Sequence, residues 1–145
     1  MKREINNFDD LLRIARTRRE RQRLLFVFVG TELPVGATPA QRAHFMQGEG
    51  GALVPLMCVD KLPSEVASFD ALLRESQQFE QPGQPWSLVF TAALTGTPAR
   101  APSDEDAERL LRRMVEAVKT GALGAYLPFN REGMPVRLGD RRMAA

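Results

Sequence analysis

The sequence predicts an α/β domain with an open, mostly parallel or mixed sheet of about five strands, flanked by helices and ending in an antiparallel β-hairpin. Three observations lead to this fold class. The chain has 145 residues, the length of one domain. Short continuous apolar runs are typical of strands covered on both faces. These runs alternate along the chain with amphipathic helical segments, which favours helices on the faces of a sheet.

The first elements lie in the N-terminal third of the chain. Asn7 is suited to cap a helix that has acidic residues in its first turn and apolar residues at helical spacing. The run 24–29 is rich in aromatic and β-branched residues and predicts a strand buried on both faces. Thr38 and Pro39 then supply a cap and a first helical residue, so a short helix is expected to about Gln47.

The middle of the chain predicts a second strand and a further helix. The run 52–59 is apolar, but Pro55 cannot donate a ladder hydrogen bond. This strand is therefore expected either away from the sheet centre or with a bulge. A helix follows, opened by Ser64 or slightly later by Ser68.

The last elements are a strand, a long helix and a hairpin. The run 86–94 predicts the third strand. The clearest helix begins at Ser103, with acidic residues in its first turn, and stops at Gly121. The runs 126–129 and 134–138 flank a connection that begins with Asn and ends with Gly, which is typical of a hairpin.

Composition limits the class of protein. Hydrophobic residues make up 43% and charged residues 26%, which excludes disordered and fibrous chains. No apolar run approaches the ~20 residues of a membrane helix, and the start of the chain lacks the apolar segment of a secretory signal. We expect a cytoplasmic protein with no membrane partner, a single domain over 1–138 and a flexible tail over 139–145.

Polar side chains follow the three predicted strands at their carboxyl ends. Open α/β sheets bind ligands at these ends. Glu32 ends the first strand, Asp60 and Lys61 end the second, and Thr95 ends the third. These four are the candidate ligand-binding residues, and a carboxylate beside an amine is suited to acid–base chemistry when burial moves their pKa values toward neutrality. The alternative is that polar residues simply follow buried strands where the chain meets water.

Six arginines lie between positions 13 and 23. In a helix that continued through them, Arg16, Arg19 and Arg23 would share a face toward phosphates. Arg16, Arg18 and Arg19 are the candidate anion-binding residues. Glu20 interrupts the run, and no aromatic residues are interleaved for base stacking. The net charge of +2 is small. A solvated helix end is therefore favoured, and nucleic acid is not expected as a partner.

The lone histidine and the lone cysteine carry little functional signal. His44 sits among polar residues and is interpreted as a surface side chain. Cys58 lies in an apolar strand and is interpreted as a small buried hydrophobe. A single cysteine excludes an internal disulfide and a multi-cysteine metal site. No cofactor and no metal are expected.

Three segments resemble a small bacterial protein family of unassigned function: 5–15 (INNFDDLLRIA), 50–63 (GGALVPLMCVDKLP) and 126–138 (YLPFNREGMPVRL). The similarity covers nearly the whole chain, and some members carry the label ribonucleotide reductase alpha subunit. Such a catalytic subunit is a large ten-stranded barrel that uses a thiyl-forming cysteine and a redox cysteine pair. This chain has one cysteine, so the resemblance implies no catalytic residue and no reductase activity.

Three hypotheses for function follow from the sequence. The first is a non-catalytic binding or protein-interaction module, whose partner is another protein or a second copy bound through an exposed sheet edge or hairpin. The second is a small-metabolite-binding protein or enzyme that uses the strand-end residues. The third is nucleic-acid binding through the arginine run, and we rank it last.

Overall fold

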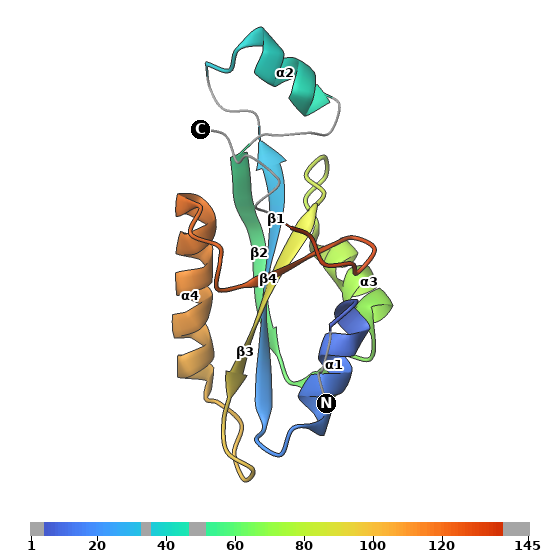
Figure 1. Cartoon of the computed structure of the whole chain (residues 1–145), viewed down its shortest axis with the longest axis vertical. Helices are drawn as coiled ribbons and strands as arrows, with labels where there is room; N and C mark the ends of the chain where they lie inside the picture. Colours follow the sequence, from blue (N-terminus) through green and yellow to red (C-terminus); the bar gives the residue numbers. More distant parts are fainter. Residues whose placement is uncertain (1–4, 33–35, 47–51, 138–145) are drawn as a thin grey trace.

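In the part of the chain that the structure describes, four antiparallel strands form one sheet, in the order β2-β1-β3-β4 (Figure 1). The strands are β1 (Gln22–Glu32), β2 (Ala52–Lys61), β3 (Leu88–Thr95) and β4 (Leu127–Asn130). The helices are α1 (Phe8–Thr17), α2 (Pro39–Met46), α3 (Phe69–Phe79) and α4 (Asp104–Thr120), with a 3-10 turn, η1, over Pro63–Glu65. This computed structural model describes residues 5–32, 36–46 and 52–137, without the side chains of His44 and Phe45. The tail predicted over 139–145 lies outside these residues.

The antiparallel sheet of four strands corrects the predicted mostly parallel or mixed sheet of about five. A parallel pair of neighbours needs a crossover helix that packs on the sheet. Instead α2 lies beyond the ends of β1 and β2, and the chain turns back so that β2 pairs antiparallel with β1 (Figure 1). α3 does make a crossover, but it carries the chain from β2 to β3, and β1 lies between these two parallel strands. The predicted alternation of helix and strand is therefore present, and the predicted parallel pairing of neighbouring strands is wrong.

Helices cover both faces of the sheet. α1 and α3 lie on one face and α4 lies on the other (Figure 1). Because successive side chains of a strand point to opposite faces, β1 contributes to both cores and is buried on both sides, as predicted. Leu24, Phe26 and Phe28 face the core under α1 and α3, and Leu25, Val27 and Val29 face the core under α4.

The helix boundaries agree with the predicted caps. The side chains of Asn7, Ser68 and Ser103 each accept a hydrogen bond from the backbone N–H three residues later. Of the two predicted starts for α3, Ser68 is the cap, and the earlier segment forms η1. Gly121 ends α4 in the left-handed conformation, with φ 82°.

β2 is an edge strand with a bulge. Its register with β1 shifts so that Met57 pairs with Phe28 and Pro55 pairs with Val29, which leaves Leu56 without a partner across the ladder. Both predicted consequences of Pro55 are confirmed, since the strand is at the sheet edge and is bulged beside the proline. Pro55 and the bulge together make this edge a poor template for further strand addition.

The predicted C-terminal hairpin is present as a turn with one full strand. After β4, Gly133 adopts φ 76° and its N–H donates to the Asn130 carbonyl at 3.0 Å. The returning arm makes an isolated bridge between Pro135 and Phe129. Within the described ranges, every helix is too short or too polar to reach across a lipid bilayer.

Candidate anion-binding site

The sheet topology separates the four strand-end residues. Because β1 runs antiparallel to β2 and β3, its carboxyl end lies at the opposite end of the sheet from theirs. Glu32 pairs with Ala52 at the start of β2. Asp60 lies near the far end of that strand, roughly 25 Å away at about 3.3 Å per residue. Glu32 therefore shares no site with Asp60, Lys61 or Thr95.

Asp60 and Lys61 are engaged in ion pairs within the fold. The Nε of Arg23 donates to Asp60 Oδ2 at 2.7 Å. The Nζ of Lys61 lies 2.9 Å from Glu75 Oε2 and 3.0 Å from Glu75 Oε1. These contacts tie β2 to β1 and to α3, so the two adjacent charges stabilise the edge strand and do not pair with each other.

The predicted anion-binding arginines divide into two kinds. α1 ends one residue before Arg18, whose backbone is already extended, so the arginines share no helical face. The Arg16 side chain is engaged within the fold, because its Nη2 donates to the carbonyl oxygen of Val66 and, at 3.1 Å, to that of Ala67. Arg18 and Arg19 are exposed to solvent.

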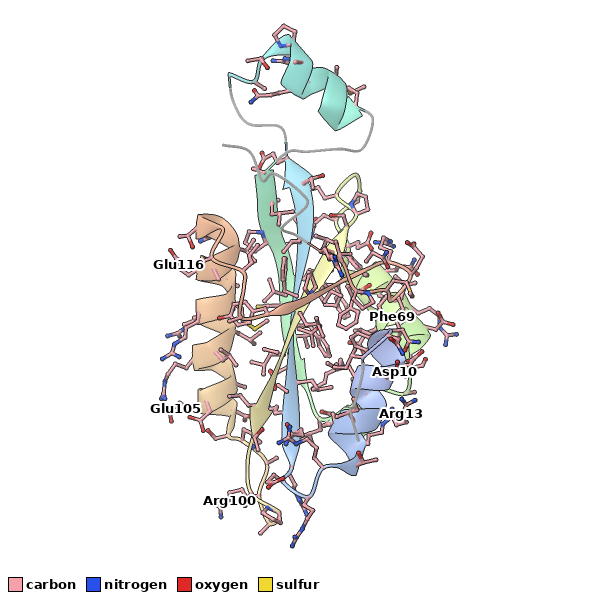
Figure 2. The ribbon with its side chains drawn as sticks, in the orientation of Figure 1. Asp10, Arg13, Phe69, Arg100, Glu105 and Glu116 are labelled. Atoms are coloured by element: carbon pink, nitrogen blue, oxygen red, sulfur yellow. The ribbon has the colours of Figure 1, made fainter. Side chains whose placement is uncertain are left out.

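A hollow of about 750 Å³, here called the α4 hollow, lies between the end of β3, the segment 96–103 and the first turns of α4. Leu94 and Leu110 line it and pack on the core under α4. Arg100 and Arg113 line it as well, and Figure 2 shows Arg100 at the end of the molecule remote from α2. Thr95 is the one predicted ligand-binding residue among its lining residues.

Arg23 holds this region to the sheet. Its guanidinium donates to Asp104 Oδ1 at 2.5 Å, to the Pro102 carbonyl at 2.8 Å and to Asp60. The hydrogen bond to Asp104, together with the charge of both carboxylates, raises the pKa of Arg23 although partial burial opposes this. The start of α4 is thereby fixed to β1 and β2, which preserves the shape of the hollow.

The acidic first turn of α4 is balanced within the helix. Arg109 lies 3.4 Å from Glu105 Oε1 and 3.6 Å from Asp106 Oδ1. Because these carboxylates already occupy the positive end of the helix dipole, the helix terminus by itself offers little to an anion. Arg100 and Arg113 make no ion pair with any other described residue. Among the described residues, they are therefore the charges lining the hollow that have no ion-pair partner.

Backbone pairing brings a second group of arginines to the same end. The Arg21 N–H donates to the Thr97 carbonyl at 3.0 Å, and the Gly96 N–H donates to the Arg21 carbonyl at 2.8 Å. The 97–100 turn is closed by the Thr97 N–H, which donates to the Arg100 carbonyl at 2.8 Å. The connection from α1 to β1 and this turn thus lie together at one end of the sheet (Figure 1). We call four exposed residues there the arginine end: Arg18, Arg19, Arg21 and Arg100.

The hollow was not predicted, because the candidate residues at the end of the third strand stop at Thr95 and the hollow is lined mainly by residues that follow it. A signal was present, since residues 96–103 contain a glycine, two prolines and an arginine before the cap of α4. That composition predicts an irregular surface segment, and such segments are frequent sites of binding. The approach of this segment to Arg21 could not be read from local sequence.

Cys58 and His44 do not belong to this site. Cys58 is exposed, which corrects its interpretation as a buried hydrophobe. The reason is that β2 is an edge strand, so the side chain lies at the margin of the core. The side chain of His44 lies outside the described part of the structure.

No protein-family model, no curated protein and no solved structure matches the chain. The resemblance to the small bacterial family therefore stays a prediction.

Proposed function

We propose that the protein is a cytoplasmic, non-catalytic binding module that takes an anionic ligand with an apolar part in the α4 hollow. One observation carries the proposal: a hollow of about 750 Å³ joins half-buried leucines to arginines that have no ion-pair partner among the described residues. Its size falls within the roughly 300–1,000 Å³ of ligand sites, which typically combine apolar walls with a few polar groups.

The chemistry of the lining residues defines the ligand class. Leu94 and Leu110 offer apolar surface that a hydrocarbon or aromatic group would remove from water. Arg100 and Arg113 offer planar guanidinium groups, which match carboxylate, sulfonate or phosphate oxygens. An amphiphilic anion satisfies both parts of the hollow at once.

The polar groups near the hollow are already engaged in contacts within the fold, which favours a binding function over catalytic turnover. The acid–base candidates Asp60 and Lys61 are each held in an ion pair that stabilises β2. Arg23 is likewise occupied by two carboxylates and a carbonyl. An exposed sheet edge and the hairpin are the other interaction surfaces expected from the sequence; the β2 edge carries Pro55 and a bulge and supports pairing less well.

The experiment uses anilinonaphthalene sulfonate, a fluorescent probe with one anionic group on an apolar ring system. We expect saturable binding to the intact chain, and we expect Arg113→Gln to weaken it about 3- to 10-fold because one charge-assisted contact is lost. The dissociation constant is measured by fluorescence titration at low ionic strength.

Arg112→Gln is the matched control. Arg112 is the preceding residue on α4, is exposed, pairs with Glu108 and does not line the hollow. Equal binding by both variants, or no saturable binding by the intact chain, would contradict the proposal.

A further inference from the structure

The arginine end extends the charged surface of the α4 hollow. Arg100 belongs to both, because it lines the hollow and lies on the turn that pairs with the backbone of Arg21. From there the exposed arginines continue to Arg18 and Arg19. A ligand confined to the hollow would leave Arg18, Arg19 and Arg21 without an ion-pair partner among the described residues.

We infer that the ligand is an acidic protein segment in which an apolar residue enters the α4 hollow and successive carboxylates run over the arginine end. This inference rests on the proposed function and extends it to the chemical class of the partner. An extended segment advances roughly 3.3–3.6 Å per residue, so its side chains reach successive arginines beyond the hollow.

Charge and shape favour an acidic peptide over a nucleic acid. The large hydrophobic side chains that are exposed in the described residues belong to Met46, Leu62, Phe79 and Met134, and the one aromatic residue among them, Phe79, lies at the end of α3. The arginine end thus lacks the aromatic platform on which single-stranded bases stack. Glu20, Asp104 and Glu105 are interspersed among its arginines and those of α4, which breaks up the continuous basic face that a duplex needs.

The apolar part of the hollow explains why the partner is expected to be a peptide and not a simple polyanion. Leu110 and Leu94 are half-buried and present carbon surface beside the charges. A polyanion without an apolar group leaves this surface in water. A leucine next to glutamates covers it and places carboxylates at the distance where they meet guanidinium groups.

The test uses a fluorescein-labelled peptide in which a leucine pair precedes about eight glutamates, an extended length of roughly 26–29 Å. Fluorescence anisotropy measures its binding to the full chain. We expect Arg18→Gln/Arg19→Gln/Arg21→Gln to weaken binding about tenfold, as three exposed ion pairs would. The control triple variant Arg74→Gln/Arg112→Gln/Lys119→Gln removes the same charge elsewhere on the exposed surface, and we expect it to bind as the intact chain does.

The outcomes separate this inference from the proposed function. If Arg113→Gln weakens the sulfonate probe and the peptide while the triple variant at the arginine end does not affect the peptide, the extended segment is wrong and the hollow stands. If only the triple variant weakens peptide binding and the probe does not bind, the arginine end is supported as a site for acidic peptides and the α4 hollow is contradicted as a ligand site.

Two competitors complete the test. Polyglutamate without leucines should compete less well than the labelled peptide's unlabelled form. Equal competition would overturn the apolar anchor. A double-stranded DNA oligonucleotide that binds more tightly than the peptide, and that depends on the same arginines, would overturn the acidic protein in favour of nucleic acid.

Discussion

At the scale of single residues, the hydroxyl of Thr91 is a buried donor and acceptor that has no hydrogen-bond partner within the described ranges. Thr91 lies on β3 between Phe26 and Leu127 of the adjacent strands, and it is 3% exposed. Its Oγ1 makes no hydrogen bond to any other described residue. An unpaired buried hydroxyl costs stability, and valine has nearly the same shape without it. We expect Thr91→Val to raise the free energy of unfolding by about 1 kcal/mol, measured by urea denaturation.

Thr95→Val tests whether that gain comes from the missing partner. Thr95 lies on the same strand, but its hydroxyl donates a hydrogen bond to Gln22 Oε1 at 3.2 Å. Its replacement should therefore lower stability or leave it unchanged. A similar gain from both substitutions would show that β propensity, and not the unpaired hydroxyl of Thr91, accounts for the effect.

At the scale of elements, local patterns predicted where helices and strands lie but not which strands become neighbours. Caps such as Ser103 and stops such as Gly121 act within one turn, so sequence reveals them. Whether β1 and β2 pair parallel or antiparallel depends on the path of the chain between them. Residues 36–43 have no strongly apolar face from which this path could be predicted. The strand-end site failed for the same reason, because Glu32 joins the other strand ends only in a parallel sheet. The α4 hollow depends on the long-range contact between Arg21 and Thr97.

The 97–100 turn, which carries Arg100, leaves no room for a side chain at Gly96. A Cβ on Gly96 would collide with the Arg100 carbonyl oxygen and would lie 2.9 Å from Pro102 Cδ and 3.0 Å from Pro102 N. Because most of this obstruction is backbone, the whole turn must shift. We expect Gly96→Ala to lower the free energy of unfolding by about 1–3 kcal/mol and to weaken binding of the acidic peptide.

Gly124→Ala provides the control for this substitution. A Cβ at Gly124 meets nothing within 4 Å, so alanine there should cost little and even gain from the lower entropy of the unfolded chain. Urea denaturation of both variants gives the comparison. A Gly96→Ala variant as stable as the Gly124→Ala variant would mean that the 96–103 segment adapts freely and does not fix the hollow.

At the scale of the whole molecule, the excursion that carries α2 lies at the opposite end from the arginine end (Figure 1). The described side chains on this helix are exposed, including Met46 at 84%, and the described residues of both cores come from other elements. Glu32 and Ala52 pair directly across the ladder, so a short turn can join β1 to β2.

We expect replacement of residues 33–51 by Asn-Gly, a two-residue hairpin turn, to preserve the fold. A shorter connection has a lower entropic cost of closure, by roughly 0.6 kcal/mol for each halving of its length, so the free energy of unfolding should stay equal or rise. Circular dichroism, urea denaturation and peptide anisotropy check this prediction. A loss of cooperative unfolding would show that the excursion belongs to the core, and a loss of peptide binding alone would show that it contributes to the site.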